Sequence, residues 1–205
     1  MPCKAATGTV WSEEVTELPG KSDRKMTQKS DADIRETHAA DLPRIEALYD
    51  LAFPDEELMP LVRQLLGGEN DVLSLVALDG DRLVGHVAFT ICRIEGADGA
   101  IAMLAPLAVA PAYQRRGIGS ALVDEAFRRL RSGGILRVQV LGDPAYYGRF
   151  GFAPDDRVTT PYPLPAEWRT AWQYIDLSDG AGEDEVMSGR LSVPPVWQEE
   201  ALWLQ

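Results

Sequence analysis

The chain has 205 residues, of which 45% are hydrophobic and 25% are charged, so it is long enough and apolar enough to bury a substantial core. These proportions exclude collagen-like, fully disordered and disulfide-framework proteins. The formal net charge of −12 predicts no nucleic-acid or anionic-membrane partner, because the field of the protein would repel both. The longest apolar run, 100–112, contains two prolines and is too short to span a bilayer.

The N-terminal sequence predicts a tail in front of one domain. Residues 1–30 show little apolar periodicity, so we expect a flexible tail there and a single domain over 31–205, with 156–205 as a C-terminal extension. No apolar segment typical of a secretory signal follows the first lysine, and the expected location is therefore the cytoplasm. Cys3 and Cys92 lie far apart, which predicts neither a disulfide framework nor a metal site.

The spacing of apolar and turn-forming residues predicts a strand, two helices and three strands in the first half of the domain. Asp41 is the expected N-cap of the first helix, which Pro54 ends, and two glycines end the second. The predicted ranges are a strand at 33–36, a helix capped at 41 and running to 52, a helix at 56–66, and strands at 72–78, 83–94 and 100–110.

A helix and a strand then follow in an order typical of parallel pairing. Apolar residues four apart predict a helix over 117–130, and a right-handed crossover would make the next strand, 135–141, parallel to the strand at 100–110. A short helix at 144–150 and a further extended piece complete this region. The sequence therefore predicts a mixed α/β fold with a central twisted sheet and helices on both faces.

The most informative segment is the turn that precedes the helix at 117–130. Gly117 and Gly119 leave room for a ligand against the backbone. The first amides of the helix and its dipole favour an anion there. Arg115 and Arg116 add positive charges at a helix end that disfavours cations, so their placement requires an anionic partner. A phosphate or pyrophosphate is the expected ligand.

The charge distribution supports this turn as an anion site. Residues 114–149 contain seven arginines and three acidic residues, a net charge of +4, while the remainder of the chain carries −16. A P-loop would need a lysine, and none follows Lys29; a dinucleotide-binding turn would need a third glycine where Leu122 stands. The remaining alternative is a glycine-rich turn that serves packing alone, which does not explain the two arginines.

Two segments resemble a known family. Gln114–Leu122, together with the preceding Leu107–Pro111, resembles the acetyl-coenzyme A signature of the GCN5-related N-acetyltransferase (GNAT) family, where Gln/Arg-x-x-Gly-x-Gly/Ala follows a strand and a turn. Ala145–Phe152 resembles the family's later Tyr-x-x-x-Gly-Phe segment. The order of elements is similar too, over about residues 32–155, and Leu141–Phe152 is similar to the YhbS-like branch of the family.

The resemblance implies the acyl-CoA N-acyltransferase fold, acetyl-CoA as cosubstrate and no metal. A bulge would splay the strand before the turn from its parallel neighbour, so that its backbone pairs with the pantetheine arm and one amide polarises the thioester carbonyl. The implied binding residues are Leu107, Ala108 and Val109 on the strand, and Gln114, Arg115, Arg116, Gly117, Ile118, Gly119 and Ser120 in the turn and the start of the helix.

The resemblance also implies a general acid, whereas it leaves the base open. Tyr147 would protonate the departing thiolate; its alternative is a core aromatic, as we expect for Tyr146. The strand at 100–110 lacks the glutamate that many family members carry there. His86 is the candidate base, acting directly or through water, against the alternative of a packed histidine. In place of the family's asparagine before the late helix stands Asp143.

Three further features have two interpretations each. Asp55, Glu56 and Glu57 either line the acceptor cleft or favour the start of the second helix. Cys92 is expected to be a small buried hydrophobe rather than a covalent intermediate site. The aromatic residues of 161–205 either form a flap packed on the domain, or shape the acceptor pocket or a homodimer interface.

The sequence thus predicts an enzyme that moves an acetyl group from acetyl-CoA to a primary amine by direct attack in a ternary complex. The acidic surface would favour a small and cationic acceptor. An alternative of another class is a non-catalytic acyl-CoA-binding sensor that kept the turn without a base. A third is a nucleotide-binding protein that uses the same turn.

Overall fold

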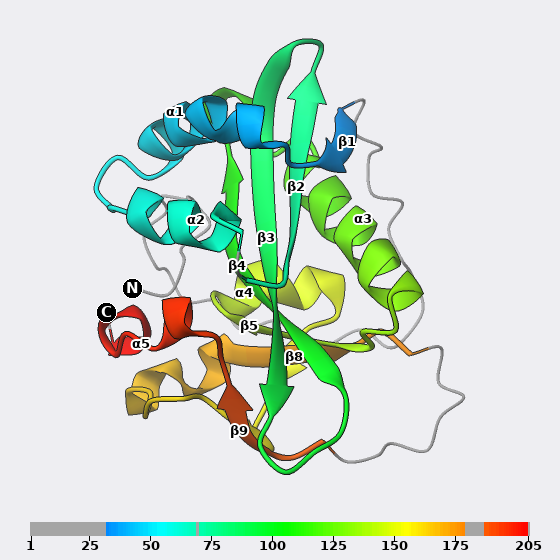
Figure 1. Cartoon of the computed structure of the whole chain (residues 1–205), viewed down its shortest axis with the longest axis vertical. Coiled ribbons are helices and arrows are strands. Elements are labelled where there is room, and N and C mark those ends of the chain that lie inside the picture. Colours follow the sequence, from blue (N-terminus) through cyan, green and yellow to red (C-terminus); the bar gives the residue numbers. More distant parts are fainter. Residues whose placement is uncertain (1–31, 69, 179–186, 205) are drawn as a thin grey trace, which may run out of the picture.

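A computed structural model of the chain describes residues 32–68, 70–178 and 187–204 (Figure 1). The predicted tail, 1–30, lies outside these residues. The described elements are β1 (Asp33–Glu36), α1 (Leu42–Ala52), α2 (Met59–Leu66), β2 (Val72–Asp79), β3 (Arg82–Ile94), β4 (Ala100–Val109), α3 (Ile118–Ser132), β5 (Arg137–Leu141), α4 (Pro144–Tyr147), β6 (Ala153–Pro154), β7 (Val158–Thr159), β8 (Trp172–Asp176), β9 (Gly189–Ser192) and α5 (Ala201–Leu204).

The strands form one sheet in the order β1-β2-β3-β4-β5-β8-β6. Neighbours pair antiparallel, except β4 and β5, which are parallel as the strand–helix–strand unit predicts. The long strand β3 also pairs at its end with β9, which in turn pairs with β7. The mixed α/β class is therefore confirmed, with a sheet that is mostly antiparallel.

Helices cover both faces of the sheet, as predicted (Figure 1). Adjacent residues of β2 alternate between the two faces: Leu75 and Ala77 pack with α3, while Val76 packs with α1 and α2. The α3 residues that reach this core are spaced three to four apart, which gives the helix one apolar side. Within the described ranges, no helix has both the length and the apolar character needed to cross a bilayer.

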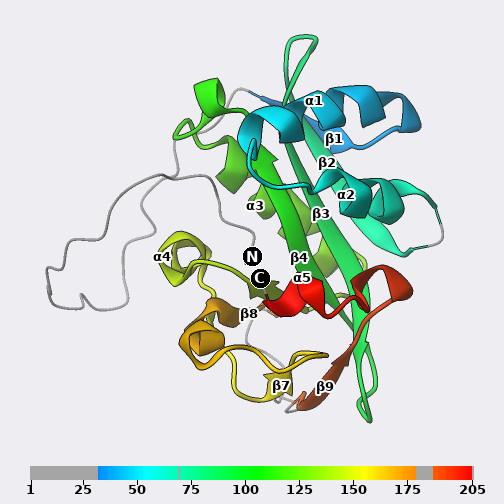
Figure 2. The same cartoon turned by 90° about the vertical axis from the view of Figure 1, so that its left-hand side faces the viewer.

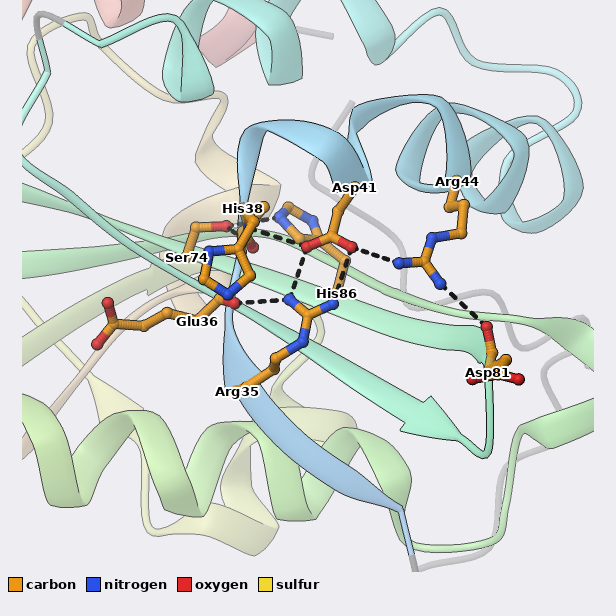
Figure 3. A network of polar contacts seen from close by, with 9 residues as sticks. Arg35, Glu36, His38, Asp41, Arg44, Ser74, Asp81 and His86 are labelled. Carbon is orange, nitrogen blue, oxygen red and sulfur yellow. Dashed lines mark hydrogen bonds and ion pairs between the residues drawn. The ribbon is translucent and has the colours of Figure 1, made fainter.

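The starts of the first two helices differ from the prediction. A 3-10 turn over Ala39–Asp41 precedes α1, and the Asp41 side chain does not cap that helix. Its buried carboxylate accepts a hydrogen bond from the His38 amide and pairs with Arg35 and Arg44 at 2.6 and 2.7 Å (Figure 3). The hydrogen bonds from Arg35 hold the pKa of Asp41 well below its usual range. This carboxylate joins the end of β1 to α1.

Helix α2 begins at Met59 and not at residue 56. Proline at its second position suits a helix start. The acidic residues Asp55, Glu56 and Glu57 therefore precede the helix, and the expectation that they favour its first turn is wrong. The other boundaries agree with the predicted ranges to within about two residues, and the predicted late helix is an α-turn followed by a 3-10 turn over Gly148–Phe150.

The C-terminal extension is folded onto the sheet. Strands β8 and β6 continue the sheet beyond β5, and β9 lies along the end of β3 (Figure 2). The buried Asp155 joins this extension to β5, because it accepts hydrogen bonds from Arg137 at 2.6 Å and from Gln139 at 2.7 Å. Three tryptophans stack edge to face in the second core cluster, namely Trp172, Trp197 and Trp203.

Candidate functional site

Strand β4 separates from β5 halfway along its length. The two strands pair only from Ala102 to Leu104, and the register between β3 and β4 shifts beyond Leu104. On β3 one residue, Ala88, stands opposite two on β4, Ala105 and Pro106, which defines a β-bulge. The bulge that the family resemblance implied is therefore present, and proline suits it because a bulged strand needs no ladder hydrogen bond there.

Beyond the bulge, two residues of β4 turn their backbone groups toward the open side. The Ala110 amide donates to the Val84 carbonyl at 2.9 Å. Since backbone groups alternate in direction along an antiparallel strand, the amides and carbonyls of Leu107 and Val109 point away from β3. Ala108 has the opposite direction and pairs with His86. Of the three strand residues predicted to meet a ligand, Leu107 and Val109 thus present backbone groups to the splayed side.

The turn after β4 places free amides at the start of α3. The first intrahelical bond of α3 runs from the Ala121 amide to the Gly117 carbonyl, at 2.9 Å. The amides of Ile118, Gly119 and Ser120 precede it and therefore have no carbonyl one turn behind them. Gly117 adopts φ 79°, a left-handed conformation that favours glycine. The dipole and these amides make the start of α3 suitable for an anion.

Both arginines of the turn are exposed and carry unneutralised charges. Neither Arg115 nor Arg116 forms an ion pair within the part of the chain that the structure describes. Arg115 has a φ of 60°, a conformation that costs a non-glycine residue about 1 kcal/mol. The Arg116 guanidinium lies 5.0 Å from the centre of the Tyr113 ring. Gln114 contributes differently, because its side-chain amide donates to the Val109 carbonyl and fixes the turn to β4.

The two neighbouring tyrosines of α4 have different surroundings. The Tyr146 hydroxyl would lie 2.8 Å from a β-carbon at Gly119, so Tyr146 reaches the start of α3. Its half-buried ring packs against the edge of the core, so the expected core position is confirmed only in part. Arg149 lies over its ring, 3.7 Å from the centre. Burial raises the pKa of Tyr146. The structure therefore adds Tyr146 and Arg149 to the surroundings of the predicted anion site, which the motif had not indicated.

Tyr147 is buried, with 2% of its surface exposed. Its ring packs against Gly142, directly after the end of β5, and meets Phe152 edge to face at 5.7 Å. It belongs to the same core cluster as Leu107. Asp143 caps the helix that carries it, since the Asp143 carboxylate accepts from the Ala145 amide at 2.8 Å. Tyr147 thus lies at the end of the strand from which β4 diverges.

His86 does not suit the role of base that the sequence suggested. It is completely buried on β3, and the Tyr49 hydroxyl lies 2.9 Å from its Nδ1. The Ser74 hydroxyl lies 2.9 Å from its Nε2 (Figure 3), so both ring nitrogens are occupied. Burial lowers the pKa of His86 to about 3. A histidine with no open surface and so low a pKa is a poor proton acceptor, so the alternative of a packed histidine holds.

The remaining candidate groups are simpler. Cys92 is buried, and burial raises the pKa of its thiol to about 12, which makes it an unreactive apolar residue as expected. No cluster of metal-ligating side chains occurs among the residues that the structure describes.

A cavity of about 230 Å³ opens beside the bulge. Both diverging strands contribute to it, β4 through Met103, Leu104 and Ala105 and β5 through Leu141. The sequence indicated its acidic side, Asp55 to Glu57, and gave the aromatic residues of 161–205 as one possible pocket wall, whereas no motif indicated the aliphatic residues from α2 and α5. Its full lining is Asp55, Glu56, Glu57, Leu58, Leu61, Met103, Leu104, Ala105, Leu141, Trp197, Ala201, Leu202 and Trp203. A larger open groove, about 960 Å³, lies around the start of β2 and contains none of the predicted site residues.

Known proteins are similar to this chain in sequence and in fold. A family model described as "Acetyltransferase (GNAT) family" matches residues 42–152. The N-acetyltransferase YjhQ of Escherichia coli K12 is 37% identical over 161 residues, which cover 75% of this chain and 83% of YjhQ. The N-acetyltransferase YhbS of the same strain is 34% identical over 152 residues, 72% of this chain and 89% of YhbS.

Solved structures agree. E. coli YhbS in complex with CoA has a TM-score of 0.74 at 30% identity, covering 83% of this chain and 94% of that one. A GNAT acetyltransferase from Brucella melitensis in complex with acetyl-CoA has a TM-score of 0.64 at 28% identity, covering 82% and 99%. The matched region contains the bulged strand, the turn and α4. The protein belongs to the GNAT acetyltransferase family and is an acyltransferase.

Proposed function

We propose that this protein transfers an acetyl group from acetyl-CoA to a primary amine by direct attack in a ternary complex. The observation that carries the proposal is a series of polar groups that runs from the outward backbone of Leu107 and the Val109 amide to the first amides of α3 and to two arginines that form no ion pair within the described residues. An extended arm with amide groups suits the strand edge, and a pyrophosphate suits the helix start.

The residues present fit acetyl-CoA. YhbS and the Brucella enzyme, whose structures this chain resembles, hold CoA and acetyl-CoA. Gly117 permits the left-handed turn, Gly119 makes room for the Tyr146 hydroxyl at the start of α3, and Arg115 and Arg116 supply two charges for the phosphates. The amide of Leu107 is the donor we assign to the thioester carbonyl, because it lies next to the bulge and points away from β3.

The transfer forms one bond and breaks one. The amine nitrogen bonds to the acetyl carbon, the carbon–sulfur bond breaks, and its electron pair goes to sulfur. A protonated amine loses two protons, one before the attack and one from nitrogen after it. One proton leaves to solvent through the acidic side of the cavity beside the bulge, where Asp55, Glu56 and Glu57 are the titratable side chains of the lining. The sulfur gains a proton from the Tyr147 hydroxyl, and the second proton from nitrogen restores that hydroxyl, so that the products are an amide, a free thiol and one released proton.

The position of Tyr147 supports its role as general acid. The ring lies against Gly142 at the end of β5, on the side to which β4 has opened. Replacing Tyr147 by Phe keeps the packing and removes the proton, so kcat should fall about 100-fold or more while the affinity for CoA stays unchanged. An unchanged kcat in Tyr147→Phe would show that Tyr147 contributes only packing and is not the general acid.

A ligand panel tests the function as a whole. Calorimetry with acetyl-CoA, CoA, ATP and NAD should give binding of the two CoA forms alone, and thiol release should then require both acetyl-CoA and an amine. Binding of ATP or NAD in place of CoA would contradict the proposal and favour a nucleotide-binding protein. CoA binding without thiol release for any amine would favour the non-catalytic sensor. The observation in favour of that alternative is that β4 carries no acidic residue and no histidine.

A further inference from the structure

We propose that the acceptor is an amine carried on a single apolar group, aliphatic or aromatic, and that the C-terminal segment forms the pocket for that group. The inference rests on the proposed acetyl transfer and concerns the cavity of about 230 Å³ beside the bulge. It depends on which residues line the cavity, on where the cavity lies, and on which polar atoms of the lining already have hydrogen-bond or ion-pair partners.

The lining contains two kinds of residue and no others. Ten of the lining residues are apolar and three are acidic; basic, hydroxyl and amide side chains are absent from this set. Such a surface stabilises an apolar body by removing it from water and a positive charge by attraction. It offers no side-chain hydrogen-bond donor to a carboxylate or a phosphate, so acceptors that carry these groups would lose their water contacts without replacement.

The cavity lies where an acceptor must lie for direct attack. Met103, Leu104 and Ala105 line it immediately before the bulge, and Leu141 lines it at the end of β5. The splayed edge of β4 that we assign to the thioester begins on the next residues of the same strand. An amine in the cavity would therefore reach the acetyl carbon from the side on which residues of α2 and α5 share the cavity lining with β4.

The tryptophans of the wall present only their apolar surface. The indole N–H of Trp197 donates to the Thr90 hydroxyl, and that of Trp203 donates to the Trp197 carbonyl, each at 2.9 Å. Their rings lie edge to face at 6.4 Å between centres. Because these hydrogen bonds fix both rings, the wall is ordered before any acceptor binds, which lowers the entropy cost of binding.

The acidic side of the cavity is free to meet a cation. In the part of the chain that the structure describes, Asp55, Glu56 and Glu57 form no ion pair, whereas the nearby Arg63 pairs with Glu46. Glu56 is half-buried, and Asp55 and Glu57 are exposed. The three carboxylates would hold a protonated amine at the mouth while its apolar body enters the cavity against the wall that the two tryptophans form.

The size of the cavity limits the acceptor. Its volume of about 230 Å³ lies below the roughly 300–1,000 Å³ of pockets for drug-sized ligands. A phenylethylamine or a hexylamine suits this volume, and an aminoglycoside does not. A polyamine would bring further ammonium groups against the tryptophans, where no carboxylate compensates them.

The tryptophan side of the wall lies outside the region that the family model matches. The family match ends at residue 152, and Trp197, Ala201, Leu202 and Trp203 follow it. We therefore expect acceptor choice to depend on the C-terminal segment, while coenzyme binding depends on the matched region.

An acceptor panel gives the first test. With saturating acetyl-CoA, kcat/KM for 2-phenylethylamine and hexylamine should exceed that for spermidine and glucosamine about tenfold or more, because only the first two bury an apolar group. A higher kcat/KM for spermidine or glucosamine would overturn the inference and leave the proposed acetyl transfer intact.

Binding without reaction gives an independent test. N,N-Dimethyl-2-phenylethylamine keeps the charge and the ring but yields no stable amide, so calorimetry with the full chain measures the pocket alone. Ala201→Trp would fill the mouth and should weaken this binding about tenfold, while Glu200→Trp, one residue away and outside the lining, should not. Equal binding by both variants would contradict the proposal. CoA affinity should be unchanged in each.

The charge of the mouth is tested separately. The double variant Glu56→Gln, Glu57→Gln should weaken binding of the dimethylated amine about threefold at low salt, and less at high salt. Glu199→Gln removes an exposed charge from the C-terminal segment outside the cavity lining and serves as the control. If the dimethylated amine binds but no primary amine releases thiol, the pocket is supported and the proposed acetyl transfer is wrong. The same holds if the protein binds the amine but does not bind CoA.

Discussion

Gly142 lies so close to Tyr147 that a β-carbon at position 142 would overlap Cε2 of the tyrosine ring. The backbone of Gly142 is held on both sides, because its amide donates to the Ala171 carbonyl at 2.9 Å and its carbonyl accepts from the Gln173 side chain at 3.0 Å. Glycine at this position therefore allows Tyr147 to lie against the end of β5. The orientation of the proposed general acid, Tyr147, therefore depends on residue 142 having no β-carbon.

Gly142→Ala should displace the Tyr147 ring, since the backbone cannot yield. We expect kcat to fall at least tenfold and the free energy of unfolding to fall by about 1–3 kcal/mol, the usual cost of an added methyl in a packed site. Steady-state kinetics and urea unfolding measure the two effects. Gly148→Ala is the matched control, because a β-carbon at Gly148 would meet nothing within 4 Å. Full activity in Gly142→Ala would show that the ring position does not matter.

The sequence predicts the order of the elements well because each rests on a local signal. The glycines after α2 and α3, the turn before β3 and the apolar spacing of α3 are recognisable within a few neighbouring residues. The candidate anion site could be proposed for the same reason, since amides, glycines and arginines lie together in the chain between Gln114 and Ser120.

The contacts made across the fold were not predictable. Tyr146 and Tyr147 are neighbours of one residue type, and only the packing of α4 against Gly119 and Gly142 distinguishes them. His86 has the sequence context of either a base or a packed histidine, and the hydroxyls of Tyr49 and Ser74 that occupy it come from other elements. The aromatic residues of 161–205 had two interpretations in the sequence, and only the fold shows that Trp197 and Trp203 line the same cavity as Met103 to Ala105 of β4.

The paired arginines of the turn should dominate the salt dependence of CoA binding. Arg115→Gln with Arg116→Gln removes two charges that no carboxylate neutralises in the described residues. We expect the affinity for CoA to fall about tenfold, near the lower end of the value of a charged hydrogen bond, and the remaining affinity to vary less with salt. Calorimetry from 50 to 300 mM NaCl, roughly the range in which the Debye length shortens to a few ångströms, measures both.

Arg169→Gln is the control for this prediction. Arg169 is exposed, lies in a 3-10 turn of the C-terminal extension and is remote in sequence from the turn that begins α3. Its replacement changes the net charge of the protein by one without touching the anion site. An equal loss of affinity in Arg169→Gln would mean that the overall field, and not the local pair, attracts CoA.

His86 should make the protein less stable as the pH falls below neutrality. The unfolded chain protonates this imidazole below about pH 6.5, whereas burial keeps it neutral in the folded protein down to about pH 3. In that window the unfolded state binds more protons, so the free energy of unfolding falls by up to about 1.4 kcal/mol per pH unit. Urea unfolding between pH 7 and pH 5 measures this slope above the range in which carboxylates titrate.

His86→Gln should flatten the slope while keeping a side chain that can bond to Ser74 and Tyr49. The exposed His38 is the only other histidine of the chain, and His38→Gln should leave the slope of the parent protein unchanged. A slope that persists in His86→Gln and disappears in His38→Gln would assign the acid sensitivity to His38 and contradict the prediction.

Asp155 should contribute most of the free energy that holds the C-terminal extension to β5. Its buried carboxylate pairs with Arg137 and also accepts from the Arg157 amide at 3.0 Å. Asp155→Ala leaves the Arg137 guanidinium buried without its partner, which should lower the free energy of unfolding by about 3–5 kcal/mol. The exposed neighbour Asp156 provides the control, and Asp156→Ala should change stability by less than about 0.5 kcal/mol.

The charge itself is not what the extension requires. Replacing both partners, Arg137→Met with Asp155→Leu, removes the unpaired ion and fills the space with apolar groups, so much of the stability lost in Asp155→Ala should return. The double variant should still be somewhat less stable than the parent protein, because the Gln139 side-chain amide donates to the same carboxylate and loses its acceptor. Urea unfolding of the three variants separates these contributions. If the double variant is as unstable as Asp155→Ala, the loss comes from the backbone bonds that Asp155 accepts and not from the stranded charge of Arg137.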